Sequence, residues 1–135
     1  MSARILIVED EALVALELRF QLEGMGYGVA GVAADAATAR NLAAQEVVDL
    51  ALVDLNLADG PTGMALGREL AGDHDVAVVY LTGNPDLLRD EVAGAIGVLC
   101  KPADEAVVEA AVDFALRRRR GDRSIPAPPA MRLFG

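Results

Sequence analysis

The sequence contains only one cysteine, Cys100, among its 135 residues, and no tryptophan. A single cysteine excludes an internal disulfide, so the fold must be held by burial of apolar side chains. Cys100 lies in an apolar run, and we expect it to be a small buried side chain in a reducing compartment. A chain of this length buries roughly two thirds of its unfolded surface, which is enough for one compact domain but not for two.

Long apolar segments are also missing. The first apolar run, residues 5–8, is interrupted by the acidic residues 9–11 and is too short for the core of a signal peptide. No run approaches the roughly 18 apolar residues that cross a bilayer. We therefore expect a cytoplasmic protein with no membrane partner.

Positive charge is scarce along most of the chain. Residues 1–116 carry 20 acidic and 6 basic side chains, a net charge of −14, whereas residues 117–135 carry +5. An acidic body repels phosphate backbones, which argues against nucleic acid as a partner, and it favours binding of a divalent cation.

Short apolar runs alternate with stretches of helical spacing along the body. The runs are apolar at successive positions, which is typical of strands buried on both faces. Strict alternation predicts an α/β fold, with a five-stranded parallel sheet doubly wound by five helices. Ligands of such sheets bind at the carboxyl ends of the strands. The predicted strands are residues 5–8, 28–32, 50–53, 76–81 and 96–99, and the predicted helices are residues 12–23, 36–45, 63–71, 85–93 and a fifth from Asp104 onward.

Local signals support several of these helices. In the first, Leu13, Leu16 and Phe20 recur at helical spacing, Asp35 is a cap for the second, and Pro85 suits a first helical turn. Four consecutive arginines, residues 117–120, suit the carboxyl end of the fifth helix, although a docking or membrane-surface role is the alternative. The basic, proline-rich tail, residues 119–135, is expected to lack a fixed fold.

Polar residues follow the predicted strands where each one ends. Glu9 and Asp10 follow the first strand, Asp54 the third, Thr82 the fourth, and Lys101, the only lysine of the chain, the fifth. Each has an ordinary explanation when taken alone: an acidic first turn of a helix, a turn cap, a strand-end hydroxyl or a surface lysine. Their joint occurrence at four strand ends favours a site.

Phosphoryl transfer is the chemistry that this set suits. If the first and third strands are neighbours, Glu9, Asp10 and Asp54 crowd together, and two carboxylates about 5 Å apart repel by roughly 3 kcal/mol at an effective dielectric constant near 20. Mg²⁺ would relieve that repulsion, because it prefers oxygen ligands. Asp54 is then a candidate nucleophile, and Thr82 and Lys101 would contact phosphoryl oxygens.

Residues 3–118 resemble the receiver domain of a two-component response regulator. The resemblance is carried by residues 5–11, by residues 52–57 with the loop 59–63, by residues 80–83 and by residues 99–102. It implies the flavodoxin-like strand order 2-1-3-4-5 and a receiver domain over residues 1–118, followed by the tail. It also implies a cis peptide bond between Lys101 and Pro102.

The resemblance implies roles for individual residues. Asp54 would accept a phosphoryl group from a histidine kinase or a phosphotransfer protein. Asp10 and Asp54 would bind Mg²⁺ directly, Glu9 through water, and Asn56 through its backbone carbonyl. Thr82 and Lys101 would contact the phosphoryl group and so shift a partner-binding face. Many receivers have an aromatic residue three positions before the lysine, where this chain has Val98. A switch that works by rotation of that aromatic side chain is therefore not expected here.

We expect a stand-alone receiver that catalyses only its own phosphorylation and dephosphorylation and acts through a downstream protein partner. The sequence does not decide whether phosphorylation drives dimerisation. One alternative is a small aspartate-nucleophile phosphohydrolase, which Asp54, Thr82 and Lys101 also resemble, although Asn56 stands where its general acid belongs. The other is a docking module of the same fold that works without phosphorylation.

Overall fold

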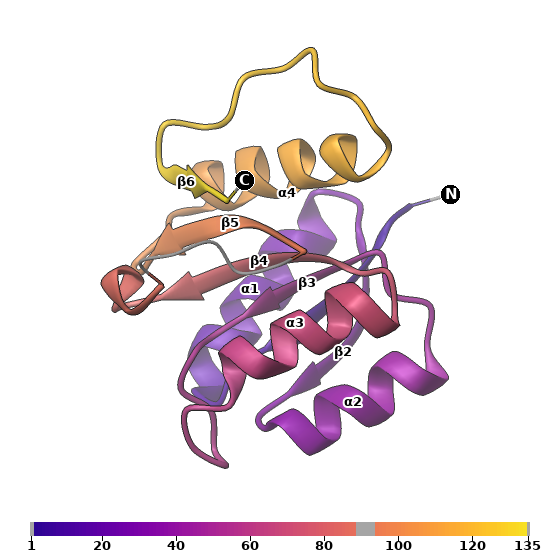
Figure 1. The fold of residues 1–135 in the computed structure, drawn as a ribbon, viewed down its shortest axis with the longest axis vertical. Helices are drawn as coiled ribbons and strands as arrows, with labels where there is room; N and C mark the ends of the chain where they lie inside the picture. Colours follow the sequence, from indigo (N-terminus) through magenta and orange to yellow (C-terminus); the bar gives the residue numbers. More distant parts are fainter. Residues whose placement is uncertain (1, 89–93, 135) are drawn as a thin grey trace.

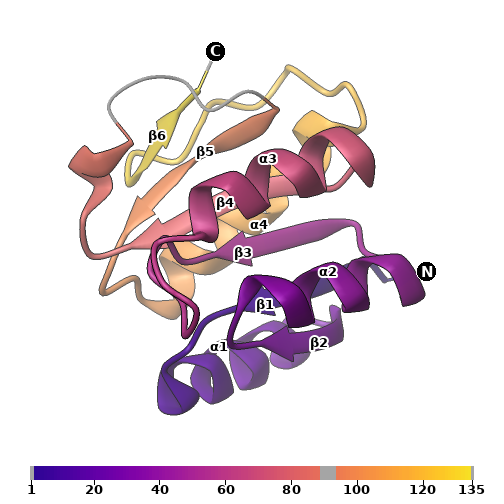
Figure 2. The same cartoon turned by 60° about the horizontal axis from the view of Figure 1, so that its bottom comes forward.

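The computed structural model describes residues 2–88 and 94–134, which form a twisted sheet covered by helices on both faces (Figures 1 and 2). The strand order is β2-β1-β3-β4-β5-β6, in which the first five strands are parallel. In chain order the elements are β1 (Arg4–Val8), α1 (Ala12–Gly24), β2 (Gly28–Ala33), α2 (Ala36–Gln45), β3 (Leu50–Val53), α3 (Gly63–Asp73), β4 (Ala77–Thr82), a short 3₁₀ turn η1 (Pro85–Leu87), β5 (Ala95–Cys100), α4 (Glu105–Arg119) and β6 (Met131–Leu133).

The prediction of five strands with a tail lacking a fixed fold is wrong at the C-terminus. Residues 131–133 form a sixth strand, β6, which pairs antiparallel with the outer edge of β5. In the tail, apolar Met131 and Leu133 alternate with charged Arg132, and apolar Phe134 follows. Such a segment can pair with an edge strand, whose backbone groups are otherwise unpaired.

The fourth predicted helix, residues 85–93, is also not found as predicted. Only Pro85–Leu87 form a helical turn, of the 3₁₀ type, and Leu88 has left the helical conformation. The remainder of that prediction, residues 89–93, lies outside the described residues. The described part of the chain therefore contains four α-helices.

The core lies on both faces of the sheet, because alternate strand residues point to opposite sides. Ile5 and Ile7 pack beneath α1 and α4, whereas Leu6 and Val8 pack with residues of α2 and α3 on the other face. Apolar runs at successive positions therefore correspond to strands covered twice, as expected.

Helix α1 is present, but the apolar side chains whose spacing indicated it do not face the sheet. Leu13 and Phe20 are 81% and 66% exposed, and Leu16 is exposed as well. The helix instead packs on the sheet through Ala15, Leu18 and Leu22. Both sides of this helix carry apolar residues at helical spacing, so periodicity alone could not select the buried side.

The helix ends follow the sequence more closely. The side chains of Asp35 and Asp104 accept hydrogen bonds from the backbone N–H groups of Thr38 and Val107, and so cap α2 and α4. At the carboxyl end of α4, Arg117 lies 3.1 Å from Asp113, and Arg119 donates to the carbonyl of Asp75. These contacts favour the structural explanation of the arginine run.

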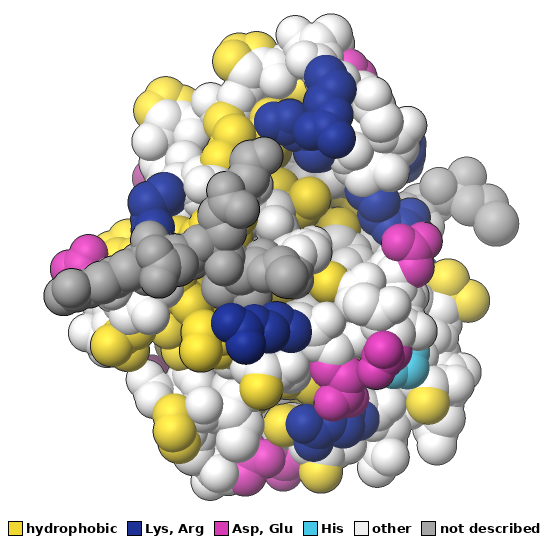
Figure 3. Space-filling view, viewed as in Figure 1, with side chains coloured by type: hydrophobic (Ala, Val, Ile, Leu, Met, Phe, Trp, Pro, Cys, Tyr) yellow, Lys and Arg dark blue, Asp and Glu magenta, His cyan; other side chains and the backbone are white. Residues whose placement is uncertain are grey.

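The surface mixes charges of both signs. Basic side chains are spread over the face in Figure 3, several beside acidic ones. Among the ion pairs, Arg40 and Glu69 join α2 to α3. Cys100 is exposed at the end of β5, which corrects the expectation that it is buried. Among the described residues, no helix has the length and apolar character needed to cross a membrane.

Candidate functional site

The predicted site residues lie at the carboxyl edge of the sheet because of the strand register. Val8, the last residue of β1, pairs with Val53, the last residue of β3, so Glu9 and Asp54 emerge from adjacent strands. Thr82 ends β4, and its carbonyl accepts a hydrogen bond of 2.8 Å from the backbone N–H of Lys101. Residues separated by up to 92 positions therefore meet at one edge.

Three carboxylates form an acidic cluster at this edge. One oxygen each from Glu9, Asp10 and Asp54 lie within 4.8 Å of one another. Glu9 and Asp54 are buried, at 3% and 9% exposure, whereas Asp10 is open to solvent. The donors are all carboxylate oxygens, and one of the residues is exposed, so the cluster fits a hard cation such as Mg²⁺ that retains water molecules.

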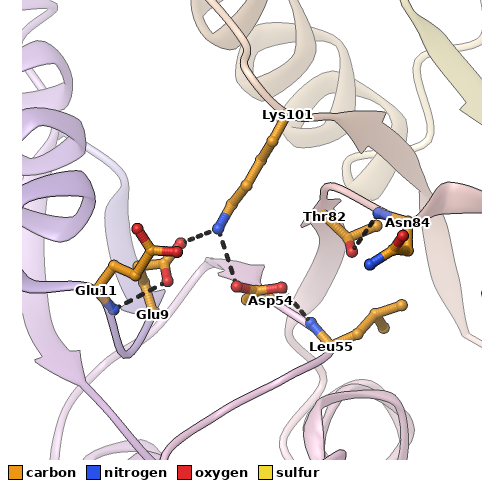
Figure 4. Close-up of polar contacts among 7 residues, drawn as sticks. All are labelled: Glu9, Glu11, Asp54, Leu55, Thr82, Asn84 and Lys101. Carbon is orange, nitrogen blue, oxygen red and sulfur yellow. Dashed lines mark hydrogen bonds and ion pairs between the residues drawn. The ribbon is translucent and has the colours of Figure 1, made fainter.

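Lys101 inserts its ammonium group between two members of this cluster (Figure 4). Its Nζ atom donates to Oδ2 of Asp54 at 2.9 Å and to Oε1 of Glu9. Burial alone would lower the pKa of Lys101, but its hydrogen bonds to Glu9 and Asp54 outweigh burial and raise the pKa. The lysine is therefore held in its charged form beside Asp54.

Burial also acts on Glu9, which is 3% exposed. Burial raises the pKa of its carboxyl, and the hydrogen bond from Lys101 offsets this effect only in part. Its second oxygen accepts a hydrogen bond of 3.1 Å from the backbone N–H of Glu11. Glu9 thus anchors Lys101 from the side opposite to Asp54.

A backbone hydrogen bond fixes the carboxylate of Asp54. Oδ1 of Asp54 accepts a hydrogen bond of 2.7 Å from the N–H of Leu55, while Oδ2 faces Lys101. Gly63, the first residue of α3, packs directly against this segment, where an added Cβ would lie 2.7 Å from the Cα of Leu55 and collide with the Asp54 carbonyl. This close approach requires glycine, a requirement that the sequence pattern did not reveal.

Thr82 lies on the side of Asp54 away from Glu9 in Figure 4. Its side chain is 1% exposed, and its Oγ1 accepts a hydrogen bond of 3.1 Å from the backbone N–H of Asn84. An accepting hydroxyl still has its own hydrogen to donate. Thr82 can therefore offer that hydrogen to a group bound at Asp54.

Asn56 lies in the exposed turn after β3, two residues beyond Asp54. The turn is held by backbone hydrogen bonds between Leu57 and Gly60, and by Asp59, which accepts hydrogen bonds from Ala36 and Thr62. The structure thus brings Glu9, Asp10, Asp54 and Lys101 together. The role of the Asn56 carbonyl stays a prediction.

A cavity of about 370 Å³ lies beside the site, between α1 and the segment after β5. Val14 and Leu18 line one side, and Lys101, Pro102 and Ala103 the other. The Lys101–Pro102 peptide bond is cis, as the resemblance implied.

Sequence comparison identifies the family to which this fold and site belong. Residues 5–113 match the sequence profile of the response regulator receiver domain. The chain belongs to that family. This assignment confirms the resemblance, favours a phosphoaccepting receiver of two-component signalling, and does not favour the phosphohydrolase or the phosphorylation-independent module.

Individual relatives agree with the assignment. The receiver is 35% identical to the phyllosphere-induced regulator PhyR of Methylorubrum extorquens over 118 residues, which is 86% of this chain and 44% of that protein. It is 33% identical to the transcriptional regulatory protein PdtaR of Mycobacterium tuberculosis, covering 87% of this chain and 58% of that one. The chain therefore spans about half the length of these relatives.

A solved structure of a receiver domain is also similar. The solution structure of the PhyR response regulator receiver domain from Erythrobacter litoralis has a TM-score of 0.75 and 29% identity, and the match covers 94% of this chain and 96% of that one. The two chains therefore share the receiver fold over nearly their whole lengths.

Proposed function

We propose that Asp54 is the phosphoacceptor of this receiver, and that a histidine kinase or a phosphotransfer protein supplies the phosphoryl group. The observation that carries the proposal is the position of Lys101, whose ammonium group lies 2.9 Å from a nearly buried Asp54 carboxylate at the carboxyl edge of the sheet. A fixed carboxylate beside a fixed positive charge suits a reaction in which positioning and charge stabilisation supply most of the rate.

In the proposed reaction, a carboxylate oxygen of Asp54 attacks the phosphorus of a phosphohistidine. The new O–P bond makes an acyl phosphate, the P–N bond breaks, and the imidazole nitrogen keeps the electron pair. Lys101 and the Thr82 hydroxyl would then donate hydrogen bonds to phosphoryl oxygens. These two residues would stabilise both the transferred group and the phosphorylated state.

Glu9, Asp10, Asp54 and the carbonyl of Asn56 would hold Mg²⁺, Glu9 through a water molecule. When bound, the ion neutralises charge on the phosphoryl oxygens. The oxygen-only donor set of the acidic cluster supports this assignment.

The apolar side of α1 would be covered by the phosphodonor protein in the cytoplasm. Leu13, Leu16 and Phe20 are exposed on the helix that borders the cavity beside Lys101. Exposed apolar side chains grouped on one helix are typical of a protein interface. Phe20→Ser should slow phosphotransfer from a histidine kinase while leaving phosphorylation by acetyl phosphate unchanged, because a small donor needs no docking surface.

Intact-protein mass spectrometry tests the proposal. With acetyl phosphate and Mg²⁺, the wild-type chain should gain one phosphoryl group, and Asp54→Asn should gain none. Asp113→Asn, an exposed aspartate paired with Arg117 on α4, is the matched control and should gain one group. Continued release of phosphate from a phosphate ester would support a hydrolase, and failure of the wild type to gain a phosphoryl group would contradict the proposal.

A further inference from the structure

The C-terminal segment of the described chain, residues 131–134, closes the outer edge of the sheet. In β6, Met131, Arg132 and Leu133 pair with Leu99, Val98 and Gly97 of β5, respectively. The next residue, Phe134, donates its N–H to the carbonyl of Ile96 at 3.0 Å. Figure 2 shows this strand lying along β5 at the end of the sheet opposite to β2.

The segment packs on both faces of the sheet. Met131 is buried with the core residues beneath α4. Phe134 packs on the other face against Tyr80, with the ring centroids 6.4 Å apart in an edge-to-face arrangement. Gly97 permits this fit, because a Cβ there would collide with the carbonyl of Arg132.

Arg132 connects the segment to the loop that follows Thr82. Its guanidinium donates to the carbonyl of Pro85 at 2.8 Å and to the carbonyl of Leu88. The loop begins at Thr82, whose hydroxyl accepts a hydrogen bond from the N–H of Asn84. One short chain of contacts therefore joins Arg132 to a residue of the candidate site.

Few contacts keep residues 131–134 on the edge of β5. The strand has three residues, Arg132 and Leu133 are exposed, and residues 121–130, which precede the strand, lie largely on the surface. A segment with few buried contacts opens at a lower free energy than the core does. Its removal would expose unpaired backbone groups of β5, to which an extended segment of another protein could add.

We propose that residues 131–134 form a releasable latch on β5, and that phosphorylation of Asp54 loosens it. The inference rests on the proposed function. If the Thr82 side chain moves toward a phosphoryl oxygen to donate to it, the Asn84 N–H either follows Oγ1 or loses it as an acceptor. In both cases the loop carrying the Pro85 and Leu88 carbonyls shifts. Arg132 then loses its acceptors. Linkage makes the coupling reciprocal, so the closed latch also disfavours the phosphorylated state.

Hydrogen–deuterium exchange of the full chain tests the latch. Peptides that contain residues 95–100 and 131–134 should exchange about tenfold faster after treatment with acetyl phosphate and Mg²⁺. Arg132→Ala and Gly97→Ala should produce the same increase without phosphorylation. The first removes the hydrogen bonds to the loop, and the second displaces β6. Arg120→Ala, an exposed arginine of the same tail that lies beside Arg4 and Asp49 and away from Leu133 and Phe134, is the matched control and should exchange as the wild type does.

The lifetime of the phosphoryl group provides a second readout, because the Arg132→Ala variant should retain the phosphoryl group longer than the Arg120→Ala variant. A phosphorylated chain whose β5 and β6 peptides exchange at the original rate would overturn the latch and leave the proposed function intact. Exchange that depends on protein concentration would also overturn it, since it would indicate that β6 pairs with a second copy. A chain that takes up no phosphoryl group would overturn both proposals.

Discussion

Lys101 is the only lysine in the sequence, and its ammonium group compensates two buried or nearly buried carboxylates. Desolvation of Glu9 and Asp54 is costly unless a positive charge stays beside them. The strand-end pattern predicted that these residues would meet. It could not predict which carboxylates Lys101 would contact, because that depends on side-chain packing between segments far apart in sequence.

Lys101→Gln should destabilise the fold by about 2 kcal/mol near neutral pH in the presence of a chelator. Breaking a fully buried ion pair costs roughly 3–5 kcal/mol, and the Lys101 side chain retains 18% exposure, which reduces the cost. Urea unfolding measures this loss.

The destabilisation by Lys101→Gln should depend on pH, and the direction of that dependence follows from the pKa of Glu9. Its pKa in the fold is already raised by burial, and without Lys101 it rises further. A raised carboxyl pKa stabilises the fold at low pH, and that contribution disappears as the pH rises through the folded-state value. The difference between wild type and variant should therefore be smaller near about pH 5 than near about pH 8, and a difference that grows on acidification would contradict this account.

Gly63→Ala should destabilise the protein by about 3 kcal/mol, because the added methyl group collides with the backbone of Asp54 and Leu55. Gly72→Ala in the same helix is the matched control, since its Cβ would meet no atom within 4 Å. An alanine there should be neutral or stabilise by about 0.5 kcal/mol. Thermal unfolding of both variants measures the contrast, and equal midpoints would refute the close approach.

At the scale of the element, apolar runs predicted the first five strands to within one residue at each end. The sequence predicted the elements less accurately where local sequence and tertiary packing disagree. The segment from Pro85 carries a helix-start signal, yet its helical turn ends at Leu87. The alternation at residues 131–133 was the available signal for β6, but a pattern of three residues is too short to separate a strand from a tail.

Helix α1 provides the clearest test at this scale, because both of its sides are apolar. Leu22→Ala should cost about 3 kcal/mol, since Leu22 is fully buried. Phe20→Ser should change the free energy of unfolding by less than about 0.5 kcal/mol, because two thirds of Phe20 is already exposed. Denaturant titration distinguishes the two variants. A large loss of unfolding free energy in Phe20→Ser would indicate that the side of α1 that carries Phe20 faces the sheet.

For the whole molecule, the sheet topology is what turns scattered residues into a site. Because β1, β3, β4 and β5 run parallel and lie side by side, the residues that follow them converge at one edge. The same topology leaves the outer edge of β5 open to β6, next to the loop that follows Thr82. A change at Asp54 therefore has a short physical route to the C-terminal segment.

The most direct test of this account is to locate the phosphoryl group after reduction with borohydride, which converts an acyl phosphate at aspartate into homoserine. Peptide mapping of the full chain treated with acetyl phosphate and Mg²⁺ should find homoserine at position 54 alone, and none when Mg²⁺ is chelated. Homoserine at another aspartate, or its complete absence after treatment with Mg²⁺, would contradict the assignment of Asp54 as the acceptor.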